Sequence, residues 1–283
     1  MTDTTNPAAA SVALRVQASL RAELERLEKM ALAVRAEHSD ALHQFRVSAR
    51  RARAVIRAAR PVVGDYYDVL DVELRWLGTE TGPARDLEVL QANLEPVVAA
   101  LDEDEGGGLA ILSVVRADQE VARHRVIEAL LSERFSVLLE VFRSATVAPA
   151  AVVGDESPPS IARGQVERLW KARRRLGDDP TDTALHAIRI KVKRTRYAVE
   201  VLVGRDAEEA KELTKALRNL QDLIGVHQDA HVAEERIRAY AVPGADLAAG
   251  RIIERERSIR VKVRQRLPAA WRRLARASGT ANA

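Results

Sequence analysis

The sequence predicts an all-α protein in which two pseudo-symmetric four-helix bundles form one compact domain. Ala, Leu, Arg and Glu dominate its 283 residues, and apolar residues recur at spacings of three and four. Alternating runs of β-branched or aromatic residues are scarce, so no strand is predicted. The chain also repeats itself at a constant offset. Because a lone helix cannot bury its apolar stripe, two packed units of about four helices each are the simplest arrangement.

The helices can be placed in order from apolar patterns and breaks. The segment LRVQASLRAELERLEKMALAV predicts a long first helix, whose apolar face carries Leu14, Leu20, Leu24, Leu27 and Ala31. A second helix begins near residue 41, because Asp40 is a good N-cap residue, and Thr183 has the same place in the second half. Breaks are expected at residues 37–40, around Pro61 and Gly64, at residues 78–86, and at the flexible loop DEDEGGG, residues 102–108.

An internal repeat organises the chain. A shift of 143 residues lays ALHQFRVSARRARAV (41–55) on ALHAIRIKVKRTRYA (184–198), and LRWLGTETGPARDLEV (74–89) on LRNLQDLIGVHQDAHV (217–232). One offset that holds over nearly fifty residues indicates a true duplication. We therefore predict a first repeat at about residues 10–143, a linker at about 144–160 and a second repeat at about 161–278.

Charge and composition exclude several classes of protein. Basic residues number 45 against 41 acidic ones, a net charge of +4, so any functional basicity depends on where the charges sit. The absence of cysteine excludes disulfides, thiolate metal sites and thiol nucleophiles. The first residues, MTDTTNPAAA, lack the pattern of a signal peptide, and no apolar stretch reaches the roughly 20 residues that span a bilayer. We expect a soluble, cytoplasmic protein with no membrane partner and no cofactor.

Cationic side chains line one face of the second helix in each repeat. At 100° per residue, five positions in the first repeat fall inside an arc of about 80°. We call them the first basic row: His43, Arg46, Arg50, Arg53 and Arg57. A separate apolar stripe on this helix is the expected core face: Leu42, Phe45, Ala49, Ala52 and Ile56. The second basic row is His186, Arg189, Lys193 and Arg196, and Glu200 stands where Arg57 would be.

Two interpretations of these rows are open. They could be solvated faces whose cations pair with carboxylates on neighbouring helices, or they could bind an anionic ligand. Like charges at these spacings repel by a few tenths of a kcal/mol per pair, and neither segment contains a local acid. Because the pattern also occurs twice, a ligand is favoured. Positions 43 to 57 rise roughly 20 Å along the helix, more than one phosphate needs, which predicts a linear polyanion.

Other functions stay open as alternatives. The rows could bind the phosphate backbone of RNA or DNA, but only 4% of the residues are aromatic, so base stacking would be limited. His227 and His231 have the i, i+4 spacing of metal ligands, yet the repeat places Ala84 and Glu88 opposite them, and no metal site is predicted. A phosphohydrolase is less favoured, because no nucleophile motif or glycine-rich phosphate loop occurs.

The paired motifs of the two repeats resemble the CHAD family of histidine-bearing α-helical domains. The first copy reads LHQFRVSARRARAVIRAARP and LRWLGTETGPARDLEVL, and the second reads LHAIRIKVKRTRYAVEVL and LRNLQDLIGVHQDAHV. The resemblance covers roughly residues 8–278 and implies a single domain of two four-helix bundles with a basic central surface or pore. It also implies a module that binds inorganic polyphosphate, and several family members associate with polyphosphate granules. Because the sequence has no nucleophile motif and no glycine-rich phosphate loop, we predict binding without catalysis.

Carried over by position, the resemblance implies a set of ligand residues in each repeat. The first set is His43, Arg46, Arg50, Arg51, Arg53 and Arg57, and the second is His186, Arg189, Lys193, Arg194 and Arg196. Further expected contributors are Arg75 and Arg218 from the third helices and Arg123 and Arg264 from the fourth. The matching Asp86 and Asp229 are expected to be orienting partners or helix caps rather than ligands.

Overall fold

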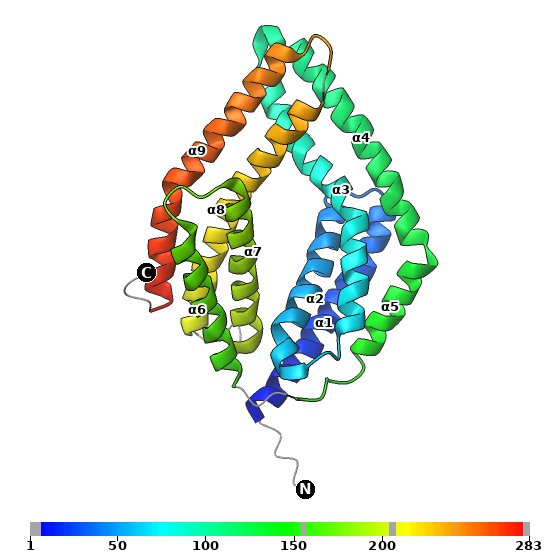
Figure 1. The fold of residues 1–283 in the computed structure, drawn as a ribbon. Coiled ribbons are helices and arrows are strands. Elements are labelled where there is room, and N and C mark those ends of the chain that lie inside the picture. The colour runs from blue at the N-terminus through cyan, green and yellow to red at the C-terminus, as the bar shows by residue number, and fades with distance from the viewer. Residues whose placement is uncertain (1–6, 154–156, 204–207, 241, 280–283) are drawn as a thin grey trace. The chain divides into compact units, whose positions relative to one another are not determined.

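The all-α prediction is confirmed by the computed structural model, which describes residues 7–153, 157–203, 208–240 and 242–279 (Figure 1). Within these ranges the chain forms helices and no strand. The α-helices are α1 (Pro7–Arg35), α2 (Ala41–Val63), α3 (Asp68–Val98), α4 (Glu105–Leu131), α5 (Glu133–Ala145), α6 (Pro158–Leu176), α7 (Asp182–Ala198), α8 (Glu208–Ala239) and α9 (Asp246–Ala277). A 3-10 turn, Asp102–Asp104, precedes α4, and a π-helical segment, Val199–Val203, continues α7.

The described residues form two compact units, and several helices contribute to both. Unit 1 contains the described parts of Met1–Gly82, His124–Leu169 and Arg194–Thr214. Unit 2 contains those of Pro83–Arg123, Trp170–Lys193 and Lys215–Ala283. The repeat boundaries and the basic central surface or pore stay predictions.

Unit 1 is built around α1 and α2, which pack side by side (Figure 1). The predicted core face of α2 is confirmed, since all five residues of its apolar stripe are buried. The Phe45 ring of that stripe lies 6.2 Å from the Phe135 ring of α5, centroid to centroid. On α1 the predicted face is right except for Leu14, whose side chain is 55% exposed. The buried positions near it are Ala13 and Val16, so the apolar stripe passes beside Leu14.

Unit 2 has its own aromatic core where α6 meets α9. The rings of Trp170 and Trp271 are tilted against each other with centroids 5.7 Å apart. The Trp170 indole Nε1 donates to the Ser278 hydroxyl at 3.3 Å, which satisfies its only polar group. Leu217, Leu220 and Ile224 of α8 are also fully buried.

The predicted break at residues 78–86 is wrong, because α3 continues through Gly82 and Pro83. Proline inside a helix removes one backbone hydrogen bond and costs roughly 3 kcal/mol. Leu77 before it and Ala84 and Leu87 after it are all buried, so α3 contributes core residues on both sides of the proline. Burial along the whole helix therefore overrides the local Gly-Pro signal.

The predicted helix break at the DEDEGGG segment is confirmed, since α3 ends at Val98 and α4 begins at Glu105, but the segment is not the flexible loop that its composition suggests. Residues 102–104 form the 3-10 turn, and Glu105 to Gly108 are the first turn of α4. A Cβ atom at Gly108 would lie 2.8 Å from the side chains of Leu101 and Val98. Close packing, rather than flexibility, therefore explains this glycine.

The other predicted breaks are confirmed in the described part of the chain. Residues 37–40 separate α1 from α2, and α2 ends before Gly64, which has a φ of 62°. Within the predicted linker at 144–160, α5 ends at Ala145 and α6 begins at Pro158, while the role of this segment as the boundary between repeats stays a prediction. Ser132 adds an unpredicted break, because its side chain caps α5 by accepting from the Phe135 N–H. No helix among the described residues is long and apolar enough to cross a bilayer.

Candidate anion-binding site

The first basic row lies on α2, which begins directly after Asp40 as predicted. The Asp40 side chain makes no cap hydrogen bond to the backbone, and its Oδ2 instead accepts from the Gln44 side chain at 2.9 Å. His43 is the third residue of α2 and is half-buried. It therefore lies in the first turn, as the sequence predicts.

Arg46 of the first row packs on the middle of α3. Its Nη1 donates to the Gly78 carbonyl oxygen and to the Thr81 hydroxyl, both at 3.0 Å. Its guanidinium also lies beside Gly82, where an added Cβ would be 3.5 Å from Nη1. The guanidinium is therefore within van der Waals reach of this position of α3. Arg50, one turn further along α2, is exposed and forms no ion pair within the described residues.

Arg53 and Arg57, at the C-terminal end of the row, share one carboxylate of α3. The Arg53 Nε donates to Asp71 Oδ1 at 3.0 Å, and the Arg57 Nη2 donates to Oδ2 at 3.1 Å. Burial of the Asp71 carboxyl disfavours its charge, but hydrogen bonds and positive charges from Arg57 and Arg53 outweigh this and lower its pKa. Asp71 is therefore ionised at neutral pH.

Arg51 does not share the face of the first row. Its Nε lies 3.4 Å from the Glu23 Oε1 of α1, and the Glu23 side chain is only 7% exposed. Arg26 contacts the same oxygen from α1 at 3.0 Å. Arg51 thus joins α2 to α1, and its expected role as a ligand stays a prediction.

The second basic row lies on α7, and its start differs from the prediction. The helix begins at Asp182, so Thr183 is inside it, and the hydroxyl of Thr181 caps it by accepting from the Ala184 N–H at 3.2 Å. The N-cap prediction for Thr183 is wrong because two hydroxyls stand close together and the earlier one reaches the free N–H. His186 is exposed and lies just beyond the first turn.

Arg189 packs in unit 2 in the way that Arg46 packs in unit 1. Its guanidinium lies beside Gly225 of α8, where an added Cβ would be 3.5 Å from Nη2. The repeat makes Arg189 equivalent to Arg46, and Gly225 equivalent to Gly82. The Arg189 Nε is buried and has no hydrogen-bond partner within the described residues.

Of the repeat-equivalent acids Asp86 and Asp229, Asp229 lies near this guanidinium, and Asp86 lies near Asp229, all in unit 2. Both are inside long helices, α3 and α8, so the prediction that they are helix caps is wrong. The Asp229 residue is exposed, but surrounding protein atoms partly desolvate its carboxyl group and disfavour the ionised form. The negative charge of Asp86 acts in the same direction. Together they raise the pKa of Asp229 against the opposing charge of Arg189. An orienting role for the two acids stays a prediction.

The second row ends in an ion pair. The Arg196 Nη1 donates to the Glu200 Oε1 at 2.6 Å, and the two side chains are only 11% and 4% exposed. The Arg196 guanidinium also lies over the Tyr197 ring, 4.2 Å from its centroid. Lys193 is half-buried, and Arg194 is exposed without an ion pair in the described part of the chain.

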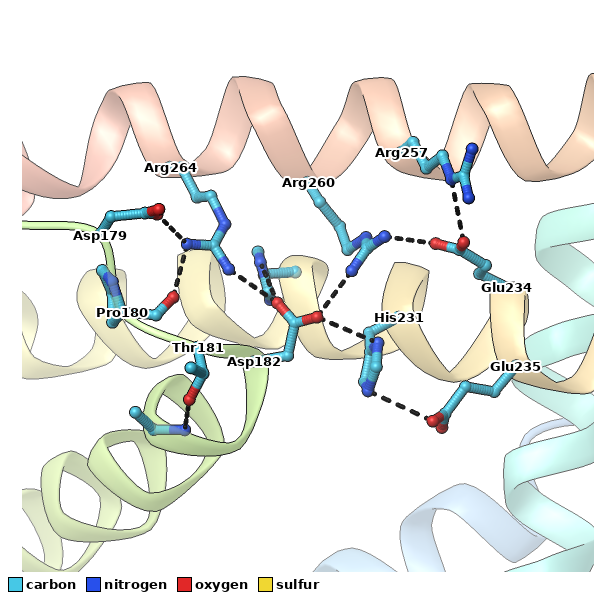
Figure 2. A network of polar contacts seen from close by, with 12 residues as sticks. Asp179, Pro180, Thr181, Asp182, His231, Glu234, Glu235, Arg257, Arg260 and Arg264 are labelled. Carbon is cyan, nitrogen blue, oxygen red and sulfur yellow. Dashed lines mark hydrogen bonds and ion pairs between the residues drawn. The ribbon is translucent and has the colours of Figure 1, made fainter.

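Asp182 anchors the start of α7 by a network within unit 2, which Figure 2 shows. Its Oδ1 accepts from the Arg264 Nη2 and its Oδ2 from the Arg260 Nη1, both at 2.7 Å. Arg264 also donates to the Pro180 carbonyl and to Asp179. Burial of the Asp182 carboxyl disfavours its charge, but Arg264, Arg260 and the two nearby histidines outweigh this and lower its pKa. The structure thus gives Arg264, an expected ligand, a helix-anchoring contact.

The histidine pair of α8 faces the same carboxylate. His227 Nε2 and His231 Nδ1 each lie 3.4 Å from an oxygen of Asp182. Burial lowers the pKa of His227 to about 4, and the charges of Arg264 and Arg260 act in the same direction against that of Asp182. His227 is therefore neutral at pH 7. No group of three or more His, Asp or Glu within the described ranges is arranged to hold a metal ion.

The remaining expected ligands lie on other helices. Arg75 is exposed on α3 in unit 1 with the first row. Arg123 of α4 and Arg218 of α8 belong to unit 2, as do His186, Arg189 and Lys193. Arg194 and Arg196 belong to unit 1. Sequence reasoning missed Asp71 and Asp182 as partners of the cations, because neither has a fixed helical spacing from them.

Nine α-helices in the described part of the chain, two of which carry the basic rows, define an all-helical domain. The chain belongs to the CHAD family, since the CHAD domain model matches residues 18–238. Two curated relatives from Mycobacterium tuberculosis, MT2285 of strain CDC 1551 / Oshkosh and Rv2226 of strain ATCC 25618 / H37Rv, are each 31% identical over 278 residues. The match covers 91% of this chain and 53% of each relative, so the chain spans about half their length.

Two solved structures are similar to this one. The crystal structure of the CHAD domain from the plant Ricinus communis has a TM-score of 0.74 and 27% identity, over 96% of this chain and 93% of that chain. PptA from Streptomyces chartreusis has a TM-score of 0.72 and 19% identity, over 92% of this chain and 99% of that chain. At that identity, the likeness to PptA concerns the fold alone.

Proposed function

We propose that this chain binds inorganic polyphosphate through its two basic rows, without catalysis. The observation that carries the proposal is the matched placement of Arg46 and Arg189. Each guanidinium lies against a glycine of another helix, and the repeat makes the two arginines and the two glycines equivalent. A pairing of arginine and glycine that occurs in both repeats is expected for a shared binding function.

Exposed cations among the expected ligands supply the charge that a polyanion needs. Arg50, Arg75 and Arg194 are exposed and form no ion pair within the described residues, so a ligand can reach them without displacing a carboxylate. Guanidinium groups bind phosphate oxygens in a bidentate manner, and a row of them fits a chain of phosphates better than a single phosphate. Membership in the CHAD family supports the same ligand. The proposal includes a cytoplasmic location and association of this chain with polyphosphate granules.

A titration tests this function directly. The protein is titrated at fixed salt with long-chain polyphosphate, tripolyphosphate and orthophosphate, and then with single- and double-stranded RNA and DNA. We expect affinity to rise with polyphosphate length and to fall steeply with salt. Each Lys or Arg that neutralises a phosphate releases a counterion from the polymer. Equal affinity for orthophosphate and long polymer would refute the proposal, and tighter binding of a nucleic acid would favour the alternative ligand.

The non-catalytic part of the proposal needs a separate measurement. Protein, long-chain polyphosphate and Mg²⁺ are incubated together, and released orthophosphate and polymer length are followed over time. We expect neither to change relative to protein-free controls. Phosphate release that scales with protein concentration would instead assign a phosphohydrolase.

A further inference from the structure

We infer that Asp71 and Glu200 are internal counter-ions that neutralise the C-terminal ends of the two basic rows, so that a polyanion contacts mainly the N-terminal parts. This inference rests on the proposed function and adds to it a limit on how much of each row the ligand uses. Both carboxylates and their arginine partners belong to unit 1, so the geometry of each pair is defined within one compact unit.

In the first row, Asp71 occupies the donors that a phosphate would need. The Arg57 Nε and Nη2 both donate to Asp71, at 3.2 and 3.1 Å, and form the side-on fork that binds an oxyanion. The Arg53 Nε donates to the same carboxylate at 3.0 Å. The Asp71 side chain is only 14% exposed, so water does little to weaken these contacts.

In the second row, Glu200 does the same for Arg196. The carboxylate is almost fully buried, and the Arg196 Nη1 contacts it at 2.6 Å. Glu200 lies in the π-helical segment, four residues after Arg196, at the position where the first row has Arg57. This row therefore has an acid where the first row has its last cation.

The two acids are not equivalent in sequence, although they act at equivalent places. The repeat pairs Arg53 with Arg196, but it pairs Asp71 with Thr214, and Glu200 with Arg57. The carboxylate comes from the next helix in the first repeat and from the same helical run in the second. The two repeats thus place a carboxylate beside equivalent arginines from non-equivalent positions. This recurrence indicates that neutralising the C-terminal end of each row serves a function.

An opposite role would also fit the contacts, because a carboxylate can orient an arginine toward its ligand. The two roles differ in the sign of the effect. An orienting acid strengthens binding, so its loss weakens the complex. A counter-ion competes with the ligand, so its loss strengthens the complex and lengthens the part of the row that the ligand contacts.

The inference changes the expected footprint on the first row. From His43 to Arg50 the helix rises about 10 Å, whereas the whole row from His43 to Arg57 rises about 20 Å. A short polyphosphate already covers the shorter stretch. When Asp71 is neutralised, the added cations are reached only by a longer polymer, so the gain should grow with chain length.

The test compares Asp71→Asn and Glu200→Gln with Glu73→Gln in the full chain. Glu73 is the matched control, because it lies on α3 two residues from Asp71, is 18% exposed and pairs with Arg134 of α5 outside the row. All three variants add the same net charge. Affinities for tripolyphosphate and long-chain polyphosphate are measured by titration over a range of salt, after circular dichroism has confirmed helicity.

We expect Asp71→Asn to bind long-chain polyphosphate about fivefold more tightly than Glu73→Gln at 0.1 M salt, because a negative charge within a few ångströms is removed. The slope of log K against log salt should steepen by roughly 0.7 for each freed cation. Tripolyphosphate affinity should change little.

Two results would overturn the inference: weaker binding by Asp71→Asn, which indicates an orienting role, or a gain no larger than that of Glu73→Gln. If the buried Glu200→Gln substitution unfolds the protein, the Asp71→Asn comparison decides alone. Failure of the wild-type protein to bind polyphosphate is a different result, which refutes the proposed function itself.

Discussion

Loss of the Asp182 carboxylate should destabilise the start of α7 and hence the second basic row. In Asp182→Asn the amide keeps one acceptor oxygen and no charge, so one of the two 2.7 Å contacts, to Arg260 or Arg264, is lost and the other becomes a hydrogen bond to a neutral oxygen. A hydrogen bond to a charged group contributes about 1.5–3 kcal/mol. The Asp182 side chain is 24% exposed, which reduces its contribution, and we therefore expect a loss of about 2 kcal/mol.

Thermal unfolding followed by circular dichroism measures this loss. For a chain of this size, about 2 kcal/mol corresponds to a fall in Tm of about 4–8 °C. Asp179→Asn is the matched control, because Asp179 makes the same kind of contact with Arg264 but its side chain is 97% exposed. We expect its Tm to stay within about 1 °C of the wild-type value. Equal shifts for the two variants would refute the anchoring role of Asp182.

Three further predictions concern pH, charge and packing. His227 has a pKa of about 4 when folded and about 6.5 when unfolded, so the unfolded chain binds more protons between these values and stability rises with pH there. In His227→Gln, the free energy of unfolding should vary with pH by up to about 3 kcal/mol less than in the wild-type protein. Parallel curves of Tm against pH for the two proteins would contradict this prediction. The double charge reversal Arg50→Glu with Lys193→Glu should abolish polyphosphate binding in a titration while helicity is kept; unfolding would instead show that the rows are structural. Gly108→Ala should lower the free energy of unfolding by about 1–3 kcal/mol through overpacking, whereas Gly106→Ala, with no atom within 4 Å of the added Cβ, should not.

The faces of α2 were predictable from sequence because a helix has a fixed period. Leu42, Phe45 and Ile56 are buried at the positions that 100° per residue assigns to the core. Duplication then selected the candidate ligand cations from the 45 basic residues of the chain, and their role as ligands stays a prediction. The predictions that were wrong relied on sequence signals only a few residues long. Gly82 and Pro83 do not break α3, since neighbours on both sides are buried.

The partners of the cations were the part that sequence could not predict. Asp71 is 14 residues from Arg57, and Asp182 is 82 residues from Arg264, so only tertiary structure brings each pair together. Glu200 was visible in principle, because four residues separate it from Arg196 and i, i+4 pairs of opposite charge attract each other. Alignment of the repeats showed it only as a missing cation, which hid its role as the partner of the preceding arginine.

A polyanion site in a nearly neutral protein has to come from the arrangement of charges rather than from an excess. With 41 acidic residues against 45 basic ones, almost every cation could in principle find a carboxylate. The two interpretations of the basic rows therefore apply to different parts of them. At the C-terminal ends, Asp71 and Glu200 hold the arginines, as expected for a face paired within the protein. Toward the N-terminal ends, Arg46 lies on Gly82 and Arg50 is exposed, as expected for a ligand site. On this reasoning, the acids that surround a basic row determine its function as much as the cations within it.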